Sequence, residues 1–208
     1  MIPDKLAAHL QVDHYGDFWL TEAVRPSLDL QVIPRQGFRV GTYRDVKAKL
    51  EVPVLVAAVS REHLFDVFLD LLDPLGEVVD VVVETSHQSD GGSHQDLHRE
   101  QIDLPVLKSY CCDFEELLMH DGCTGVAVIG TGGPMEVQFD EHKLLVVYAQ
   151  DLEPFERVLL QAGIPHDSEL KFITEGEHLH STEPQHAEVF EQFCLRLGVD
   201  EAAEHVNW

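Results

Sequence analysis

The sequence predicts an α+β protein in which β-hairpins alternate with helices that cross from strand to strand. Short stretches of alternating apolar and polar residues, typical of half-buried strands, are separated by longer stretches with apolar residues every three or four positions. Residues 54–87 and 144–178 also read as two copies of one strand–helix–strand unit. We therefore expect two similar halves of ferredoxin-like character. Each would run helix, β-hairpin, strand, helix, strand, giving a mixed or antiparallel sheet with helices packed on it.

The possible internal duplication rests on a sparse match. The two copies agree in a strand near the start and in a Glu-x-x-His sequence at the end: Val54–Val59 with Leu144–Ala149, and Glu84 and His87 with Glu175 and His178. Two unrelated units with a common apolar pattern would also share such positions, because each must bury one face. The matched Glu-x-x-His favours duplication over that alternative.

In the first half the expected elements are an opening helix, a hairpin, a third strand, a crossover helix and a fourth strand. They are placed at Pro3–Leu10, Leu28–Ile33 with Phe38–Tyr43, Val54–Val59, Leu64–Leu72 and Val78–Glu84. The boundaries follow from residues that favour turns and caps. Ser60 is placed to cap the crossover helix, and Asp73-Pro74 to end it.

The second half offers the same devices. Its expected strands are Thr124–Ile129, Met135–Phe139, Leu144–Ala149 and Leu170–Thr174, with a crossover helix between Asp151 and Gly163 and a last helix from Thr182 to Gly198. The glycine-rich sequence Gly130–Pro134 follows a strand, as a phosphate-binding loop would. A phosphate loop must open a helix, whereas this one opens another strand, so the sequence predicts a hairpin turn and excludes a nucleotide site there.

The polar segment between the halves sets the expected domain organisation. Residues 1–87 form the first half, residues 88–108 a Gly- and His-rich connection with a short helix at Asp96–Gln101, and residues 109–208 the second half. The halves could pack as two units or join one larger sheet in a single compact domain. We favour two related halves.

Composition narrows the class of protein. Thirty-eight acidic residues against fourteen basic ones give a net charge of −24, which argues against nucleic acid and anionic membranes as partners. No apolar run approaches the ~20 residues of a membrane span, and the first residues do not resemble a signal peptide. We expect a cytoplasmic protein whose four cysteines, Cys111, Cys112, Cys123 and Cys194, are free thiols. The acidity fits either a high-salt habitat or a binding role.

The first functional hypothesis is a non-catalytic interaction module, or one that self-associates. Common catalytic motifs such as Gly-x-Ser-x-Gly are absent from the sequence. Six basic residues against two acidic ones lie between Arg25 and Lys49, a concentration that stands out in so acidic a chain. This segment, with Arg35, Arg39 and Arg44 at its centre, could contact a protein partner or a second copy. It could equally pair with acidic residues of its own fold.

The alternative hypothesis is a divalent-metal-binding protein or a metal-dependent hydrolase centred on His178. The candidate ligands are His178, His180, Glu175 and His87, with His94 and His98 in reserve. Imidazole and carboxylate ligands together suit zinc or manganese. Histidines two apart share a face when their backbone is extended. A catalytic metal needs about three protein ligands and one position left for water.

Overall fold

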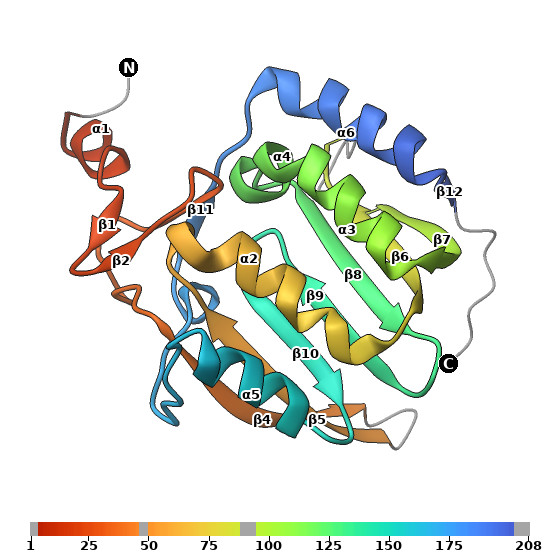
Figure 1. The fold of residues 1–208 in the computed structure, drawn as a ribbon. Coiled ribbons are helices and arrows are strands. Elements are labelled where there is room, and N and C mark those ends of the chain that lie inside the picture. Colours follow the sequence, from red (N-terminus) through yellow and green to blue (C-terminus); the bar gives the residue numbers. More distant parts are fainter. Residues whose placement is uncertain (1–3, 46–49, 88–94, 202–208) are drawn as a thin grey trace.

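A computed structural model describes residues 4–45, 50–87 and 95–201 of the 208-residue chain. It confirms the α+β prediction: helices pack on a large antiparallel sheet (Figure 1). The eight strands of that sheet lie in the order β12-β7-β6-β8-β9-β10-β5-β4. Their bounds are β4 Gly37–Asp45, β5 Leu50–Ala58, β6 Val78–Thr85, β7 Gln95–Asp103, β8 Thr124–Gly130, β9 Met135–Phe139, β10 Leu145–Ala149 and β12 Asp200–Glu201.

Two small sheets stand apart from the large one. Each has two antiparallel strands: β1 His14–Tyr15 with β2 Phe18–Trp19, and β3 Val24–Pro26 with β11 His178–His180. The second of these joins parts of the chain that lie about 150 residues apart, and so ties the N-terminal segment to the region before the last helix.

Helices α2 to α6 are grouped on one side of the large sheet, while α1 lies apart from them, next to β1 (Figure 1). Helices α2 and α5 cross β9, β10 and β5, while α3 and α4 cover the other half and α6 lies beside them (Figure 1). Their bounds are α1 Asp4–Leu10, α2 Arg61–Leu71, α3 Leu104–Asp113, α4 Glu115–His120, α5 Glu153–Gln161 and α6 Pro184–Leu197, with short 3₁₀ helices η1 Asp73–Leu75 and η2 Ile173–Glu175. Both predicted crossover helices and the predicted last helix are thus present.

The two halves of the sequence contribute to the same sheet. Helix α2 carries the chain from β5 to β6, and three strands of the second half, β8, β9 and β10, lie between these two. Of the two arrangements that the sequence left open, the structure has the single larger sheet. Part of the expected connection, residues 95–103, is itself strand β7, hydrogen-bonded to β6. The short helix expected at Asp96–Gln101 is therefore wrong, because pairing with β6 overrides the local preference.

The structure does not show the internal duplication or ferredoxin-like halves. In the first copy the unit β5–α2–β6 begins and ends in the large sheet. In the second copy β10 and α5 are present, but the strand expected at Leu170–Thr174 is not formed, and η2 occupies its end. The next strand, β11, pairs with β3 outside the large sheet. The shared pattern therefore reflects two elements that each bury one face, not a shared topology.

The first predicted hairpin is also wrong, whereas the second is confirmed. Leu28–Ile33 forms turns and bends instead of a strand. Of its alternating apolar residues only Val32 is buried, while Leu28 and Leu30 are 52% and 37% exposed, so the stretch has no continuous buried face. Strand β4 pairs with β5 instead. In the second half, β8 and β9 form the expected hairpin around the turn that begins after Gly130.

Alternating side chains on the strands separate two apolar clusters. Leu55 and Ala57 of β5 face the helices and join the main core, which includes residues from all of α2 to α6. Val56 and Ala58 point to the opposite face, where Ala58 packs with Leu144, Phe172 and other residues in a smaller cluster. The large sheet is thus covered by helices on one face and, at one end, by irregular chain on the other.

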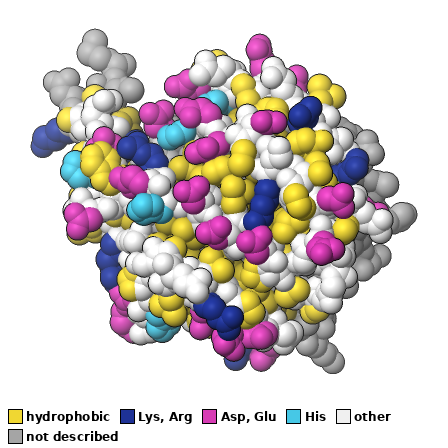
Figure 2. All heavy atoms as spheres, in the orientation of Figure 1, with side chains coloured by type: hydrophobic (Ala, Val, Ile, Leu, Met, Phe, Trp, Pro, Cys, Tyr) yellow, Lys and Arg dark blue, Asp and Glu magenta, His cyan; other side chains and the backbone are white. Residues whose placement is uncertain are grey.

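On the face of the molecule that Figure 2 shows, charged side chains are spread out. Figure 2 shows acidic side chains scattered across the helix-covered face, with fewer basic ones between them. The basic segment is partly neutralised within the fold, because Arg35 pairs with Asp167 at 2.5 Å, Arg39 with Glu175 at 3.1 Å and Arg44 with Glu51 at 2.9 Å. Lys47 and Lys49 lie outside the described residues.

Within the described residues, no helix combines the length and apolar character that a bilayer-spanning segment needs.

The core makes a first testable prediction. Phe68 of α2 and Phe139 of β9 are 0% and 1% exposed, and their rings lie 5.0 Å apart between helix and sheet. Replacing Phe68 by alanine should lower the free energy of unfolding by about 3–5 kcal/mol, because it leaves a cavity in a packed core. Leu195→Ala, at a side chain that is 82% exposed, is the control and should change it by less than about 0.5 kcal/mol. Urea unfolding of both variants measures this, and similar small effects would contradict the described core.

Candidate metal centre

One end of the large sheet collects residues from distant parts of the sequence. The last residue of β6, Thr85, pairs with the first residue of β8, Thr124, and the last residue of β9, Phe139, pairs with Leu145 at the start of β10. The segments that follow β6, precede β8 and join β9 to β10 must therefore meet at that end. These segments carry His87, Asp121 to Cys123, and His142.

Three histidines meet beside this end of the sheet. His142 lies in the turn between β9 and β10, while His178 and His180 are alternate residues of β11 and so share a face. Their ring centroids are 4.7–5.2 Å apart in every pair. Each ring offers a nitrogen within 4.8 Å of one on each of the other two. We call these three residues the histidine cluster.

In all three histidines the Nδ1 atom is already engaged with an oxygen. The partners are Asp140 Oδ2 for His142 at 3.0 Å, the Gly176 carbonyl for His178 at 2.9 Å and the Gly122 carbonyl for His180 at 2.7 Å. Carbonyl and carboxylate oxygens only accept, so each Nδ1 donates its proton. A neutral ring then keeps its lone pair on Nε2, which is the arrangement that metal-bound histidines usually show.

The local environment shifts the pKa values of two of the three imidazoles in opposite directions. For His142, burial favours the neutral ring, but the hydrogen bond and charge of Asp140 outweigh it and raise the pKa. For His180, burial lowers the pKa. A metal ligand must be neutral, so metal binding would compete with a proton at His142 more than at His180.

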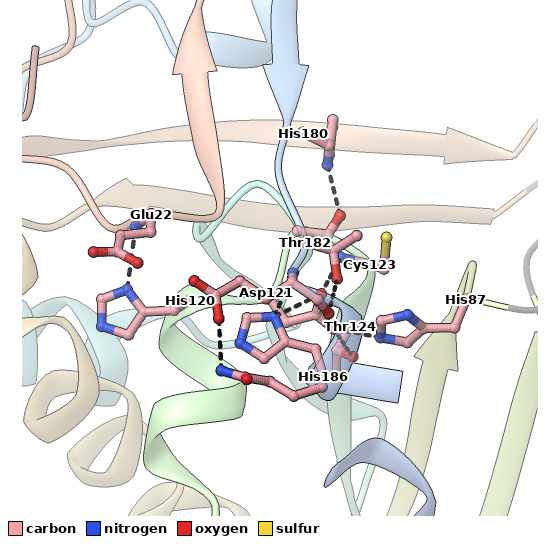
Figure 3. Close-up of polar contacts among 12 residues, drawn as sticks. Glu22, His87, His120, Asp121, Cys123, Thr124, His180, Thr182 and His186 are labelled. Carbon is pink, nitrogen blue, oxygen red and sulfur yellow. Dashed lines mark hydrogen bonds and ion pairs between the residues drawn. The ribbon is translucent and has the colours of Figure 1, made fainter. Parts of the chain in front are cut away.

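A buried carboxylate lies next to the histidine cluster. Asp121, at the end of α4, is 0% exposed, and its Oδ2 accepts hydrogen bonds from His87 Nε2 at 2.7 Å and Thr124 Oγ1 at 2.5 Å. Its Oδ1 accepts from the backbone N–H of Cys123 at 3.3 Å. Figure 3 shows these groups converging on Asp121, with Thr182 above it.

The hydrogen bonds decide the charge state of Asp121. Burial alone would raise the pKa of this carboxyl. The hydrogen bonds from His87, Thr124 and Thr182 outweigh burial and hold the pKa well below its usual range. Asp121 is therefore an ionised carboxylate inside the protein, stabilised by donors from the segment after β6, from β8 and from the segment before α6.

His186 completes the surroundings of Asp121. It is buried in the first turn of α6. Its Nδ1 accepts a hydrogen bond from the backbone N–H of Glu183 at 3.2 Å, which caps the helix, and lies 3.5 Å from Asp121 Oδ1. Because the Nδ1 lone pair accepts this hydrogen bond, we assign His186 to helix capping and packing and not to metal binding.

The structure distributes the ligands predicted from the sequence among several places. His178 and His180 come together in the histidine cluster. Glu175 instead accepts from the Phe172 N–H at 3.1 Å and pairs with Arg39, while His87 bonds to Asp121. His98 lies on β7, opposite Val82 and Asp200. His94 lies outside the described residues.

Three residues of this region were not predicted: His142, Asp121 and Lys143. Lys143 is 5% exposed, has a positive φ of 62° and donates from Nζ to the Thr124 carbonyl at 2.9 Å. Burial lowers its pKa to about 8. The sequence Asp140-Glu141-His142-Lys143 does mark a polar turn in a hairpin. No local pattern, however, links His142 to His178, thirty-six residues later.

A small cavity of about 30 Å³ borders the cluster, with His142, Lys143 and Thr21 among its lining residues. The Thr21 hydroxyl is buried and has no hydrogen-bond partner among the described residues. A space of this volume is large enough for one water molecule. Most of its lining residues are apolar, however, and His142 is the one member of the histidine cluster among them.

Asp121 makes a second testable prediction. Asp121→Asn should lower the free energy of unfolding at pH 7 by about 3 kcal/mol, because it breaks a buried hydrogen-bonded pair. The folded pKa lies below the unfolded value of about 3.9. This contribution should therefore be complete above about pH 4 and be lost as the pH falls further. Unfolding curves from pH 7 to pH 2 should show the two proteins converging at low pH. Asp66→Asn, at an exposed position on α2, is the control; an equal loss there would contradict the assignment.

Comparison with known proteins found no matching family model, no matching curated protein and no matching solved structure.

Proposed function

We propose that this protein binds a divalent transition metal through His142, His178 and His180, and that its function is metal-dependent hydrolysis. The observation that carries this proposal is the state of the three rings. They lie within reach of one ion, and each has its Nδ1 proton bound to an oxygen, so that Nε2 is left as the ligand atom. Surface histidines that meet by chance have no reason to share this arrangement.

Zinc fits the ligand set best. Three imidazoles are a known set for catalytic zinc, which is usually bound by three protein ligands and keeps its fourth position for water. Neighbouring ligand atoms around a tetrahedral zinc lie roughly 3.3 Å apart, given bonds of about 2.0–2.1 Å. The cluster, with its nitrogens within 4.8 Å of one another, therefore needs only modest closure around an ion. Manganese, the other metal expected, prefers more oxygen ligands.

With three protein ligands, the fourth coordination position of the metal is left for water, which favours a hydrolytic role over a purely structural one. A zinc-bound water has its pKa lowered towards about 7 and can attack an electrophilic substrate at neutral pH. Asp140 and Glu141, in the same turn as His142, add negative charge that attracts a cation.

Metal binding gives the third prediction. Protein purified without an affinity tag should contain about one zinc per chain, or take up one in a calorimetric titration after treatment with chelator. His142→Gln should weaken zinc binding by more than tenfold, because it removes one of three ligands. Cobalt substitution followed by absorption spectroscopy reports the coordination number.

A matched control separates the cluster from the other histidines. His63→Gln changes an exposed histidine on α2, remote in sequence from the cluster, and should leave zinc affinity unchanged. Equal affinity in the wild type, His142→Gln and His63→Gln proteins would overturn the proposal. So would the absence of both bound metal and thermal stabilisation by zinc.

Self-association, the first hypothesis from the sequence, remains a second proposal with its own supporting feature. Strand β4 lies at one edge of the large sheet, and Val40 and Tyr43 on it are 38% and 48% exposed. A long edge strand with exposed apolar side chains can pair with the same strand of a second copy. The arginines of the basic segment support this less, because Arg35, Arg39 and Arg44 have carboxylate partners within the chain.

The fourth prediction tests this edge. If β4 pairs with a second copy, the wild-type protein should sediment as a dimer, and Val40→Lys with Tyr43→Lys should shift it to a monomer, since lysine on an edge strand opposes pairing. Leu160→Lys, at an exposed position on α5, should have no effect. A monomeric wild type, or a dimer that survives the double substitution, would refute it.

A further inference from the structure

The turn formed by Asp121, Gly122 and Cys123 connects the buried carboxylate to the histidine cluster. On one side of the turn, Asp121 is held by His87 and Thr124. On the other side, the Gly122 carbonyl accepts the Nδ1 proton of His180 at 2.7 Å (Figure 3). A single peptide unit therefore separates the carboxylate residue from the atom that orients a candidate ligand.

Gly122 packs tightly against the residue that follows β11 and the residue that precedes β3. Its N–H donates to the Ser181 carbonyl at 2.8 Å, and the Ser181 N–H donates to the Ala23 carbonyl at 2.8 Å. A Cβ atom at residue 122 would lie 2.4 Å from the Ala23 carbonyl oxygen and 2.8 Å from that of Ser181. The position therefore admits only glycine, because any side chain would push the backbone away from β3 and β11.

We propose that Asp121 and His87 are positioning residues of the metal site, and that they act through the Gly122 carbonyl on His180. This inference rests on the proposed function for its purpose, but its structural content can be tested without metal. The Asp121 carboxylate, held by buried donors, fixes the conformation of the turn. The turn in turn fixes the direction in which the Gly122 carbonyl points. The carbonyl then selects the His180 tautomer that presents Nε2.

The proposal gives His87 a role different from that of a ligand. His87 Nε2 is 2.7 Å from Asp121 Oδ2, and its ring packs against Phe190 of α6 at 5.6 Å between centroids. Its side chain is 7% exposed. His87 is thus a buried donor that satisfies the carboxylate, two steps away from the histidine that it helps to orient.

The fifth prediction concerns the tautomer of His180 in metal-free protein, read from long-range ¹H–¹⁵N NMR spectra. In the wild type, His180 should carry its proton on Nδ1. In Asp121→Asn it should become a mixture of tautomers, while His178, held by the Gly176 carbonyl, keeps the proton on Nδ1. His178 is thus an internal control in the same spectrum. Zinc affinity should fall by about 10- to 100-fold, as for other lost partners of metal-bound histidines.

Matched variants keep the proposal falsifiable. Asp140→Asn should disturb His142 and leave His180 unchanged, because its contact is with a different ring. His87→Phe should act like Asp121→Asn, and His87→Gln, whose amide can still donate to Asp121, should restore much of the wild-type behaviour. These two variants replace Asp121→Asn if that protein does not fold.

Two results would overturn the positioning role: a folded Asp121→Asn or His87→Phe protein in which His180 keeps the wild-type tautomer, or one that binds zinc with wild-type affinity. If the wild-type protein binds no metal but the variants show the expected tautomer change, the proposed function alone is contradicted.

Discussion

The region around the candidate site depends on one buried negative charge. An ionised carboxylate inside a protein is stable only if hydrogen-bond donors replace the water it has lost. Asp121 receives these donors from the end of β6, the start of β8 and the segment before α6. Satisfying one side chain therefore requires three distant segments to be in place together. The histidine cluster lies beside the point where they meet.

Much of the fold could be predicted from the sequence where local signals and packing agree. Helices α2 and α5 have one apolar face and clear stop residues, and the β8–β9 hairpin has a glycine-rich turn between two short strands. Where local signals and packing disagree, packing determines which element is formed. Leu28–Ile33 alternates in sequence but forms an irregular segment. Asp96–Gln101 was expected to form a short helix but is part of a strand that pairs with β6. Neither outcome is visible in a window of ten residues.

The candidate site was partly predictable for a similar reason. His178 and His180 were found because ligands two apart on an extended segment form a local pattern. His142 and Asp121 were missed because their significance arises only from the sheet order, which brings one hairpin turn and one helix end to the same place. His87 and His178 hold the same place in the two Glu-x-x-His sequences, yet the structure gives them different surroundings: His87 contacts Asp121, and His178 joins the histidine cluster. A short shared motif says little when the surrounding topology differs.

The interleaved strand order also has a consequence for how the chain assembles. Strands β5 and β6 are neighbours in sequence, but the gap between them is filled by β8, β9 and β10, which are synthesised later. Until those strands arrive, the facing edges of β5 and β6 have no partners, and the helix that joins them has only part of its sheet to pack on. Contacts between residues far apart in sequence slow folding, because a long loop must close before they are formed. The first half of this chain therefore cannot complete its sheet until β8, β9 and β10 are synthesised and fill the centre between β5 and β6.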